Sequence, residues 1–278
     1  MQGLAAMEGA VTAVTGFEKG SGKTTFLDLA LARLRPAGPV ALFSIGLDGG
    51  QKPDGGLIRV RPGDILLTAE SLVRSSDTRV EVLEALPARA GLGRLLLGRV
   101  LRAGSVTLAG CDHLSLLSQA IQRVRSEGWA HSLLVDGAVN RLTQVAALGE
   151  VGFVFTARVE AANLARIVPR LRTLALLDRL PWEPEPEGLR WEGPLSSSGL
   201  STLPEGLDSL SIEDLTKVFL ELQELGRLQG RMRLSVRHRL PLRAFVIALR
   251  GLERRAFLEA LGPEAAPRVV FHPCEEAA

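Results

Sequence analysis

A glycine-rich turn between a strand pattern and a helix pattern, at residues 11–35, constrains this chain most. Residues 11–15 (Val-Thr-Ala-Val-Thr) are apolar and β-branched, as in a buried strand. Glycines at positions 16, 20 and 22 follow, and Lys23-Thr24-Thr25 begins a segment whose apolar residues recur at helical spacing up to Arg35. Strand, glycine turn, Gly-Lys-Thr and helix in this order predict a phosphate-binding loop.

These residue types suit the chemistry of a bound triphosphate. Glycine adopts backbone conformations that turn successive N–H groups toward phosphate oxygens, and a helix start adds unpaired N–H groups and the positive end of its dipole. We expect Lys23 to neutralise the β- and γ-phosphates as a catalytic group, and the Thr24 hydroxyl to bind Mg²⁺. The alternative is an ordinary Gly/Ser turn before an amphipathic helix. The predicted nucleotide-binding residues here are Gly16, Lys19, Gly20, Ser21, Gly22, Lys23, Thr24 and Thr25.

The loop is one residue longer than the usual pattern. Counting back from Gly22, Phe17 holds the usual position of the first glycine, and the glycine is Gly16. In this respect the segment resembles the dethiobiotin synthetases, so an ATP-dependent small-molecule ligase is one alternative function. No lysine follows the second strand in the pattern with which those ligases bind carbamate, although Lys52 lies nearby. A module that binds a nucleotide without hydrolysing it is another alternative.

Composition and charge limit the classes of protein to which the chain can belong. The 278 residues are 46% hydrophobic and 23% charged, as in a globular protein of one large or two small domains. A net charge of +2, from 33 basic and 31 acidic residues, argues against a nucleic-acid binder. The two cysteines, Cys111 and Cys274, have no metal-ligand spacing and favour a reducing compartment. Because we find no export signal or membrane-length apolar run, we expect a cytoplasmic protein without a membrane association.

Two acidic residues follow later apolar runs and are candidates for the site. Residues 39–46 are a second apolar run, which gives the β-α-β order of a parallel sheet, and Asp48 in the polar loop after it is a catalytic candidate that positions water or Mg²⁺. A plain turn aspartate is an equal alternative. Residues 131–135 form another apolar strand, which ends in Asp136, our candidate for holding Mg²⁺ or its water. Asp136 has the alternative of capping its loop, and Asn140 and Arg141 are either nucleotide contacts or loop scaffolding.

The remaining patterns predict an α/β fold: a P-loop NTPase with a mostly parallel central sheet flanked by helices, an inserted β-hairpin region and a small α/β C-terminal extension. Residues 69–86 are expected to be helical with a break at 75–77, and residues 93–101 and 105–110 to form the hairpin. Helices are also expected at 114–126, 159–177, 211–228 and 252–261, and strands at 151–156, 232–240, 244–249 and 268–271. The predicted domains are 1–180 (nucleotide-binding), 181–209 (a Pro/Gly/Ser-rich connector) and 210–278 (a small α/β domain or sheet extension).

The tail holds a basic cluster without interleaved aromatic residues. We interpret it as a solvated face or as the contact for an acidic protein partner, in preference to a nucleic-acid patch. The four histidines make no pair at ligand spacing, so no metal beyond Mg²⁺ is expected. The cluster consists of Arg227, Arg231, Arg233, Arg237, His238, Arg239 and Arg243.

Several segments together resemble one family, the P-loop subunit of the lysine 5,6-aminomutase reactivase. They are residues 16–25 (GFEKGSGKTT), 44–49 (SIGLDG), 62–68 (PGDILLT), 92–104 (LGRLLLGRVLRAG), 106–110 (VTLAG) and 135–141 (VDGAVNR). The match covers most of residues 10–178 and thins out beyond Pro181. The Asp-Gly-Ala-x-x-Arg segment and the Gly-rich hairpin make it more specific than the widely shared Gly-Lys-Thr-Thr.

The resemblance implies a nucleotide-dependent reactivating chaperone that exchanges the damaged cobalamin of an adenosylcobalamin-dependent aminomutase in lysine degradation. It also implies a MutS-like ATPase partner, the aminomutase as client, and weak ATPase or GTPase activity with Mg²⁺. The chain lacks the Asn-Lys-x-Asp guanine signature, which favours ATP over GTP.

Overall fold

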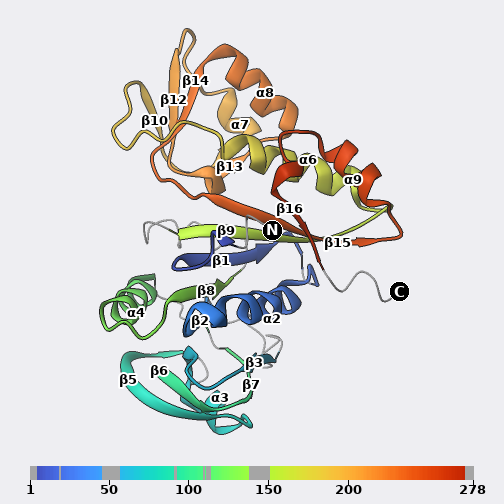
Figure 1. Ribbon diagram of the computed structural model, residues 1–278. Helices are drawn as coiled ribbons and strands as arrows, with labels where there is room; N and C mark the ends of the chain where they lie inside the picture. The colour runs from blue at the N-terminus through green and yellow to red at the C-terminus, as the bar shows by residue number, and fades with distance from the viewer. Residues whose placement is uncertain are drawn as a thin grey trace. The chain divides into compact units, whose positions relative to one another are not determined.

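The computed structural model (Figure 1) describes residues 5–18, 20–45, 57–90, 93–108, 110, 114–137 and 151–272. The chain divides into two compact units, residues 1–141 and 142–278. Both units are α/β and contain parallel strands and helices, as the sequence predicts, and the first unit also contains antiparallel pairs. The division differs from the predicted domain ends at residues 180 and 209, because the strand that begins at Val151 and the helix that begins at Leu164 pack with later elements of the second unit.

The first unit contains, in chain order, β1 (Val11–Gly16), α2 (Lys23–Leu34), η1 (Arg35–Ala37), β2 (Val40–Ser44), β3 (Ile58–Val60), β4 (Ile65–Ala69), α3 (Glu70–Arg74), β5 (Arg79–Ala90), β6 (Gly93–Arg102), β7 (Gly104–Val106), α4 (Leu114–Ser126) and β8 (Ser132–Asp136). Within this unit the sheet order is β1-β8-β2-β4-β6-β5. The pairs β1/β8, β8/β2 and β2/β4 are parallel, and β4/β6 and β6/β5 are antiparallel.

Continuous burial explains the central strands of this sheet. Nearly every residue of β1, β2 and β8 is buried, as expected for parallel strands covered on both faces. Helix α2 packs against β1 and β8. Its buried face consists of Phe26, Leu27, Ala30, Leu31 and Leu34. This packing fixes the direction of α2, and therefore where its first turn lies relative to the ends of the strands.

The inserted antiparallel region differs from its predicted pairing. Residues 79–86, predicted as helix, belong to β5, and only Glu70–Arg74 of the predicted helix is helical. Strand β6 pairs with β5 and β4, while β7 pairs with β3. The hairpin predicted across residues 102–104 was therefore wrong. The apolar spacing of Val80, Leu83 and Leu86 fits a helix, but pairing with β6 overrides that local preference.

The second unit contains β9 (Val151–Glu160), α6 (Leu164–Leu177), β10 (Leu189–Trp191), β11 (Leu195–Ser196), α7 (Ser197–Leu200), β12 (Ser209–Ile212), η3 (Leu215–Lys217), β13 (Val218–Phe219), α8 (Leu222–Arg231), β14 (Arg233–Val236), β15 (Leu242–Arg250), α9 (Arg254–Leu261), η4 (Ala266–Arg268) and β16 (Val269–Phe271). Strand β15 pairs in parallel with β9 and β16. A separate parallel sheet has the order β10-β12-β14, and β11 pairs with β13.

Two predictions for the second unit need correction. Residues 181–209, predicted as a connector, contain β10, β11 and α7, and β10 pairs with β12. The helix predicted over 211–228 was wrong in its first half, because Ser211 and Ile212 lie in β12 and the helix α8 begins at Leu222. Ser-Ile-Glu-Asp resembles a capping sequence, but Ser211 pairs instead with the neighbouring strand β14.

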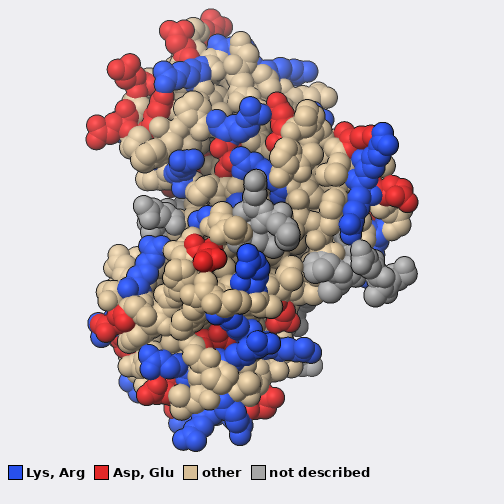
Figure 2. All heavy atoms as spheres, in the orientation of Figure 1, with Lys and Arg blue, Asp and Glu red and all other residues tan. Residues whose placement is uncertain are grey.

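Acidic side chains neutralise part of the basic cluster in the second unit. Arg233 forms an ion pair with Glu183, and Arg237 with Glu192 at 3.0 Å. Burial lowers the pKa of Arg243, which lies partly inside the unit. Figure 2 shows acidic and basic side chains interspersed over the visible face of the molecule. None of the helices in the part of the chain that the structure describes is long and apolar enough to cross a membrane.

Candidate functional site

The glycine turn after β1 is built by backbone conformations that only glycine adopts readily. Gly20 has φ 80°, and Gly22, the residue before α2, has φ 91° and ψ 12°. A Cβ atom at either position would meet no other heavy atom within 4 Å. Glycine is therefore required here by the left-handed backbone and not by crowding. Open space above such a turn is what a bound group would fill.

The first turn of α2 has none of the groups that normally close a helix start. No side chain accepts a hydrogen bond at its N-cap, and its first turn contains no acidic residue. The first hydrogen bond of the helix joins the Phe26 N–H to the Gly22 carbonyl at 2.9 Å. The amides of Lys23, Thr24 and Thr25 consequently have no acceptor within the helix. This end of the helix attracts an anion through both its N–H groups and its dipole.

Lys23, as the first residue of α2, carries a cation where the helix dipole disfavours one. A helix selected only for stability would have an acid or a capping side chain at this end. The lysine and the absent cap both oppose the stability of α2, and both favour a bound anion. This local conflict between stability and residue choice is typical of a functional position.

Asp136 lies at the carboxyl end of β8, between the ends of two parallel neighbours. It is in register with Val14 of β1 and with Ser44 of β2. The Ile45 N–H donates to the Asp136 carbonyl at 2.8 Å, and the Gly137 N–H donates to the Val14 carbonyl at 3.1 Å. These bonds continue the sheet up to the last residue and fix the backbone from which the carboxylate extends.

The sheet and the helix bring Lys23 and Asp136 together. The Lys23 Nζ lies 3.5 Å from the Asp136 Oδ1, and the two side chains are 28% and 23% exposed. Ser21 of the glycine turn is buried, Thr24 is half-buried and Thr25 is exposed. The result is a partly solvated ion pair beside the open start of α2. Such a pair can be reached by a ligand from solution.

The residues of the site fit a magnesium ion held together with phosphate. Mg²⁺ prefers oxygen ligands, and in phosphate sites it takes one or two from the protein and the rest from phosphate and water. Thr24 and Asp136 offer a hydroxyl and a carboxylate of this kind. Across the described ranges there is no group of three or more His, Cys, Asp or Glu side chains that could hold a metal by themselves.

The remaining predicted residues are not all placed. Gly16 is the last residue of β1, and Gly20 to Thr25 form the turn and the first turn of α2. Four predicted residues lie outside the described ranges: Lys19, Asp48, Asn140 and Arg141. The sequence named Lys23 and Asp136 individually but did not predict their ion pair. Two buried parallel strands that lie side by side have their carboxyl ends at one edge of the sheet. The two continuous apolar runs before these residues are therefore the signal that could have suggested the ion pair.

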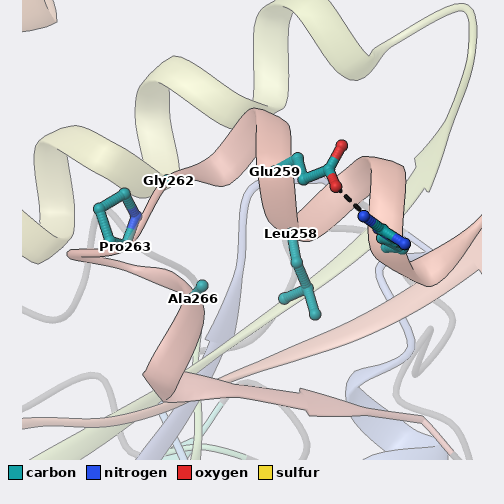
Figure 3. Close-up of a pocket in the computed structure, with 6 residues that line it drawn as sticks. Leu258, Glu259, Gly262, Pro263 and Ala266 are labelled. Atoms are coloured by element: carbon teal, nitrogen blue, oxygen red, sulfur yellow. Dashed lines mark hydrogen bonds and ion pairs between the residues drawn. The ribbon is translucent and has the colours of Figure 1, made fainter.

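A groove in the second unit contains none of the predicted residues. It runs along α9 and the turn after it (Figure 3) and is lined by Arg255, Leu258, Glu259, Gly262, Pro263 and Ala266. Arg255 Nε donates to Glu259 Oε1 at 2.9 Å across one helical turn. Both charged side chains are mostly exposed, so this ion pair is a surface feature of α9.

The chain was compared with family models, with curated proteins and with solved structures. No family model, no curated protein and no solved structure matches the chain.

Proposed function

We propose that the chain is a P-loop protein that binds a magnesium nucleoside triphosphate at the start of α2, with ATP as the expected nucleotide and GTP as the alternative. The observation that carries the proposal is the position of Lys23. Its ammonium group stands at the first turn of an uncapped helix, 3.5 Å from a carboxylate at the end of the adjoining parallel strand. A lysine, an open helix start and a carboxylate are the three groups that a magnesium triphosphate needs.

Each group has a separate role in this proposal. The amides of the glycine turn and of α2 bind the phosphate oxygens, and Lys23 neutralises their charge. Thr24 and Asp136 hold Mg²⁺, which when bound offsets the charge of the phosphates. Asp48 is proposed to position water, and Asn140 and Arg141 to contact the nucleotide.

Isothermal titration calorimetry with ATP and GTP in excess Mg²⁺ tests this function. Lys23→Ala should weaken binding by about ten- to a hundredfold, because charge-assisted hydrogen bonds to the phosphates are lost. Lys217→Ala is the matched control, since this lysine lies in the second unit and pairs with Glu213. Equal affinity of Lys23→Ala and the unaltered protein would contradict the proposal, as would the absence of binding to either nucleotide.

The proposed use of the nucleotide is the reactivation of an adenosylcobalamin-dependent aminomutase in the cytoplasm, together with a MutS-like ATPase. The support for this is the resemblance of the six segments between residues 16 and 141, four of which lie wholly or mainly in the described ranges. The test is reconstitution of an inactivated aminomutase with both proteins, ATP and fresh cofactor. Recovery of turnover that requires Lys23 is the expected result, and no recovery would exclude this use.

The longer glycine loop favours one second candidate, a ligase of the dethiobiotin synthetase type. Under this alternative, diamino acids and CO₂ stimulate the release of phosphate from ATP. A phosphate-release screen separates the two candidates, because the reactivase requires a protein client and the ligase requires only small molecules.

A further inference from the structure

We propose that the turn after β14 is a docking site for an acidic segment of a partner protein, and that a carboxylate of this segment replaces Glu192 on Arg237. The site lies wholly in the second unit, and the inference does not depend on nucleotide binding. It narrows the basic cluster of the tail to the residues that directly follow β14, which are Arg237, His238 and Arg239.

Parallel pairing places this turn at one edge of the sheet β10-β12-β14 (Figure 1). The last residues of the three strands, Trp191, Ile212 and Val236, stand in one row of the register. The pairing continues past this row, because the Arg237 N–H donates to the Ile212 carbonyl at 3.0 Å. The backbone of the turn is therefore fixed at the carboxyl ends of the strands, which is the edge where ligands of open parallel sheets bind.

Arg237 binds a carboxylate that can be exchanged for another. Its Nη1 donates to Glu192 Oε1 at 3.0 Å, and its Nη2 donates to the Trp191 carbonyl at 3.4 Å. The Arg237 side chain is 11% exposed, whereas the Glu192 side chain is 77% exposed. Packing therefore holds the arginine in place, while its carboxylate reaches it from the solvent side on a flexible stem. A carboxylate of another chain can approach the guanidinium by the same route.

Arg239 gives the turn a second cation. It is exposed, and among the residues that the structure describes no acidic side chain pairs with it. At the start of β14, by contrast, Arg233 is paired with Glu183. Glu213, which also lies at the carboxyl end of the sheet, has its own partner, since the Lys217 Nζ lies 3.6 Å from its Oε2. When Glu192 leaves Arg237, the turn therefore presents two positive charges to solvent.

Trp182 adds a fixed apolar surface beside the turn. It pairs with Val236, whose N–H donates to the Pro181 carbonyl and whose carbonyl accepts from the Glu183 N–H, both at 2.9 Å. The indole Nε1–H donates to the Arg237 carbonyl at 3.0 Å, and the residue is nevertheless 56% exposed. Because its backbone and its ring are both held, Trp182 loses little conformational freedom when a partner covers it. Tryptophan and arginine are also the residues that dominate the energetics of protein–protein contacts.

The chemistry of these groups identifies the kind of partner. Glu192 already occupies Arg237, so the geometry of this position accepts a carboxylate. A surface for single-stranded nucleic acid has a groove of cations and several aromatic residues on which successive bases stack. Two arginines and one tryptophan instead fit a short protein segment, with carboxylates for Arg237 and Arg239 and an apolar side chain for Trp182.

Fluorescence anisotropy of the full chain with a fluorescein-labelled peptide of Glu and Leu tests the inference. The protein should bind this peptide at least about tenfold more tightly than a twin with Gln in place of each Glu. Trp182→Ala should weaken binding about tenfold or more, and Arg239→Ala about fivefold. Glu192→Gln removes the competing carboxylate and keeps an oxygen for Arg237, so it should tighten binding about three- to tenfold.

Arg231→Ala is the matched control, because it removes an equal charge of the same cluster from the end of α8 and should leave the affinity unchanged. A loss equal to that of Arg239→Ala would show a general effect of charge and overturn the proposal. The proposal also fails if the peptide does not bind, or if Glu192→Gln does not tighten its binding. Tighter binding of a labelled oligothymidylate than of the peptide would assign the surface to nucleic acid instead. Thermal melts of each variant confirm that the comparison is made between folded proteins.

Discussion

Both units place an aspartate at, or just beyond, the end of a strand that lies between two parallel neighbours, yet the two carboxylates have opposite surroundings. In the first unit β8 lies between β1 and β2, and in the second β12 lies between β10 and β14. Asp136, at the end of β8, is 23% exposed and faces the Lys23 ammonium. Asp214, two residues beyond β12, is fully buried and accepts hydrogen bonds from the Thr216 N–H at 2.7 Å and the Thr216 hydroxyl at 2.5 Å.

The two units also differ in how one of their helices begins. Helix α8 of the second unit begins with a capping box, in which the Glu221 side chain accepts from the backbone of Glu224 and the Glu224 carboxylate accepts from the Glu221 N–H. Helix α2 begins without any side-chain cap. The start of α8 is therefore closed by the chain's own polar groups, and the start of α2 is left open. The difference teaches that an aspartate after a buried strand indicates a site only when the neighbouring helix start is open.

Breaking a buried ion pair in the first unit should cause the largest loss of stability. This result would show that a carboxylate stabilises the fold because it is buried, whichever unit contains it. Arg35 holds Asp64 through two contacts, Nε to Oδ1 at 3.2 Å and Nη2 to Oδ2 at 2.6 Å, and the Asp64 side chain is 2% exposed. Arg35→Ala leaves that buried charge without its cation, although the Arg61 N–H still donates to Oδ2 at 2.8 Å, so the unfolding free energy should fall by about 3–5 kcal/mol.

Tryptophan fluorescence in urea can follow this loss in one unit at a time. The three tryptophans are Trp129 in the first unit and Trp182 and Trp191 in the second. Trp182→Phe with Trp191→Phe therefore leaves a reporter for the first unit only. Arg74→Ala, which breaks the exposed pair with Glu70, is the control and should change stability by less than about 1 kcal/mol. A similar small loss for Arg35→Ala would contradict the assignment.

Removing the buried carboxylate of the second unit should have an intermediate effect. Asp214→Ala removes the buried carboxylate that accepts from the Thr216 N–H and hydroxyl, so stability should fall by about 1–3 kcal/mol. With Trp129→Phe as background, Trp182 and Trp191 report on this unit during denaturation in urea. Asp208→Ala, at an exposed aspartate before β12, is the control. Equal stability of the two variants would make Asp214 no more structural than a surface residue.

The pH dependence of stability sharpens the same contrast. Burial raises the pKa of Asp214 above its usual value of 3.8, against the opposing hydrogen bonds from Thr216. The folded state then binds the proton more tightly than the unfolded state, so the stabilisation from protonation is present at low pH and is lost as pH rises through the folded pKa. A difference of one between the pKa in the folded state and the pKa in the unfolded state corresponds to about 1.4 kcal/mol of unfolding free energy.

Denaturation of the second unit between pH 7 and pH 4 measures this contribution against an Asp214→Asn background. The unaltered protein should gain stability relative to Asp214→Asn as pH falls, since only the carboxyl group titrates. Parallel pH profiles of the two proteins would show that the buried carboxyl contributes no proton linkage.

Sequence patterns predicted the elements whose burial is continuous and local. The strands at Val11, Val40 and Ser132 and the helix at Leu114–Ser126 were confirmed, because apolar runs and helical periodicity report burial directly. Strand β5 was missed because its apolar spacing also fits a helix, and its pairing with β6 depends on contacts that no local pattern contains. The same reason applies to Ser211 and Ile212, which a capping pattern assigned to a helix and parallel pairing placed in β12.

The candidate site was predictable in its parts but not in its pairing. The glycine turn requires left-handed backbone at Gly20 and Gly22, and glycine in a turn before a helix signals that requirement directly. The contact between Lys23 and Asp136 depends on β8 lying beside β1, although most of the first unit separates the two strands in the chain. The burial of Asp214 likewise depends on the packing around β12, so nothing in its flanking residues distinguishes it from Asp136.

The smallest effect on stability is expected for the Lys23–Asp136 pair, which belongs to the proposed binding site. The Lys23–Asp136 pair joins two partly exposed side chains, and pairs of this kind contribute about 0–1 kcal/mol. Asp136→Asn should therefore shift the urea midpoint of the first unit by less than Arg35→Ala does, with a loss below about 1 kcal/mol. A carboxylate retained for stability would behave as Asp64 does and destabilise the unit when neutralised. If Asp136→Asn unfolds the first unit as readily as Arg35→Ala, then Asp136 is structural, and the contrast between the two strand ends disappears.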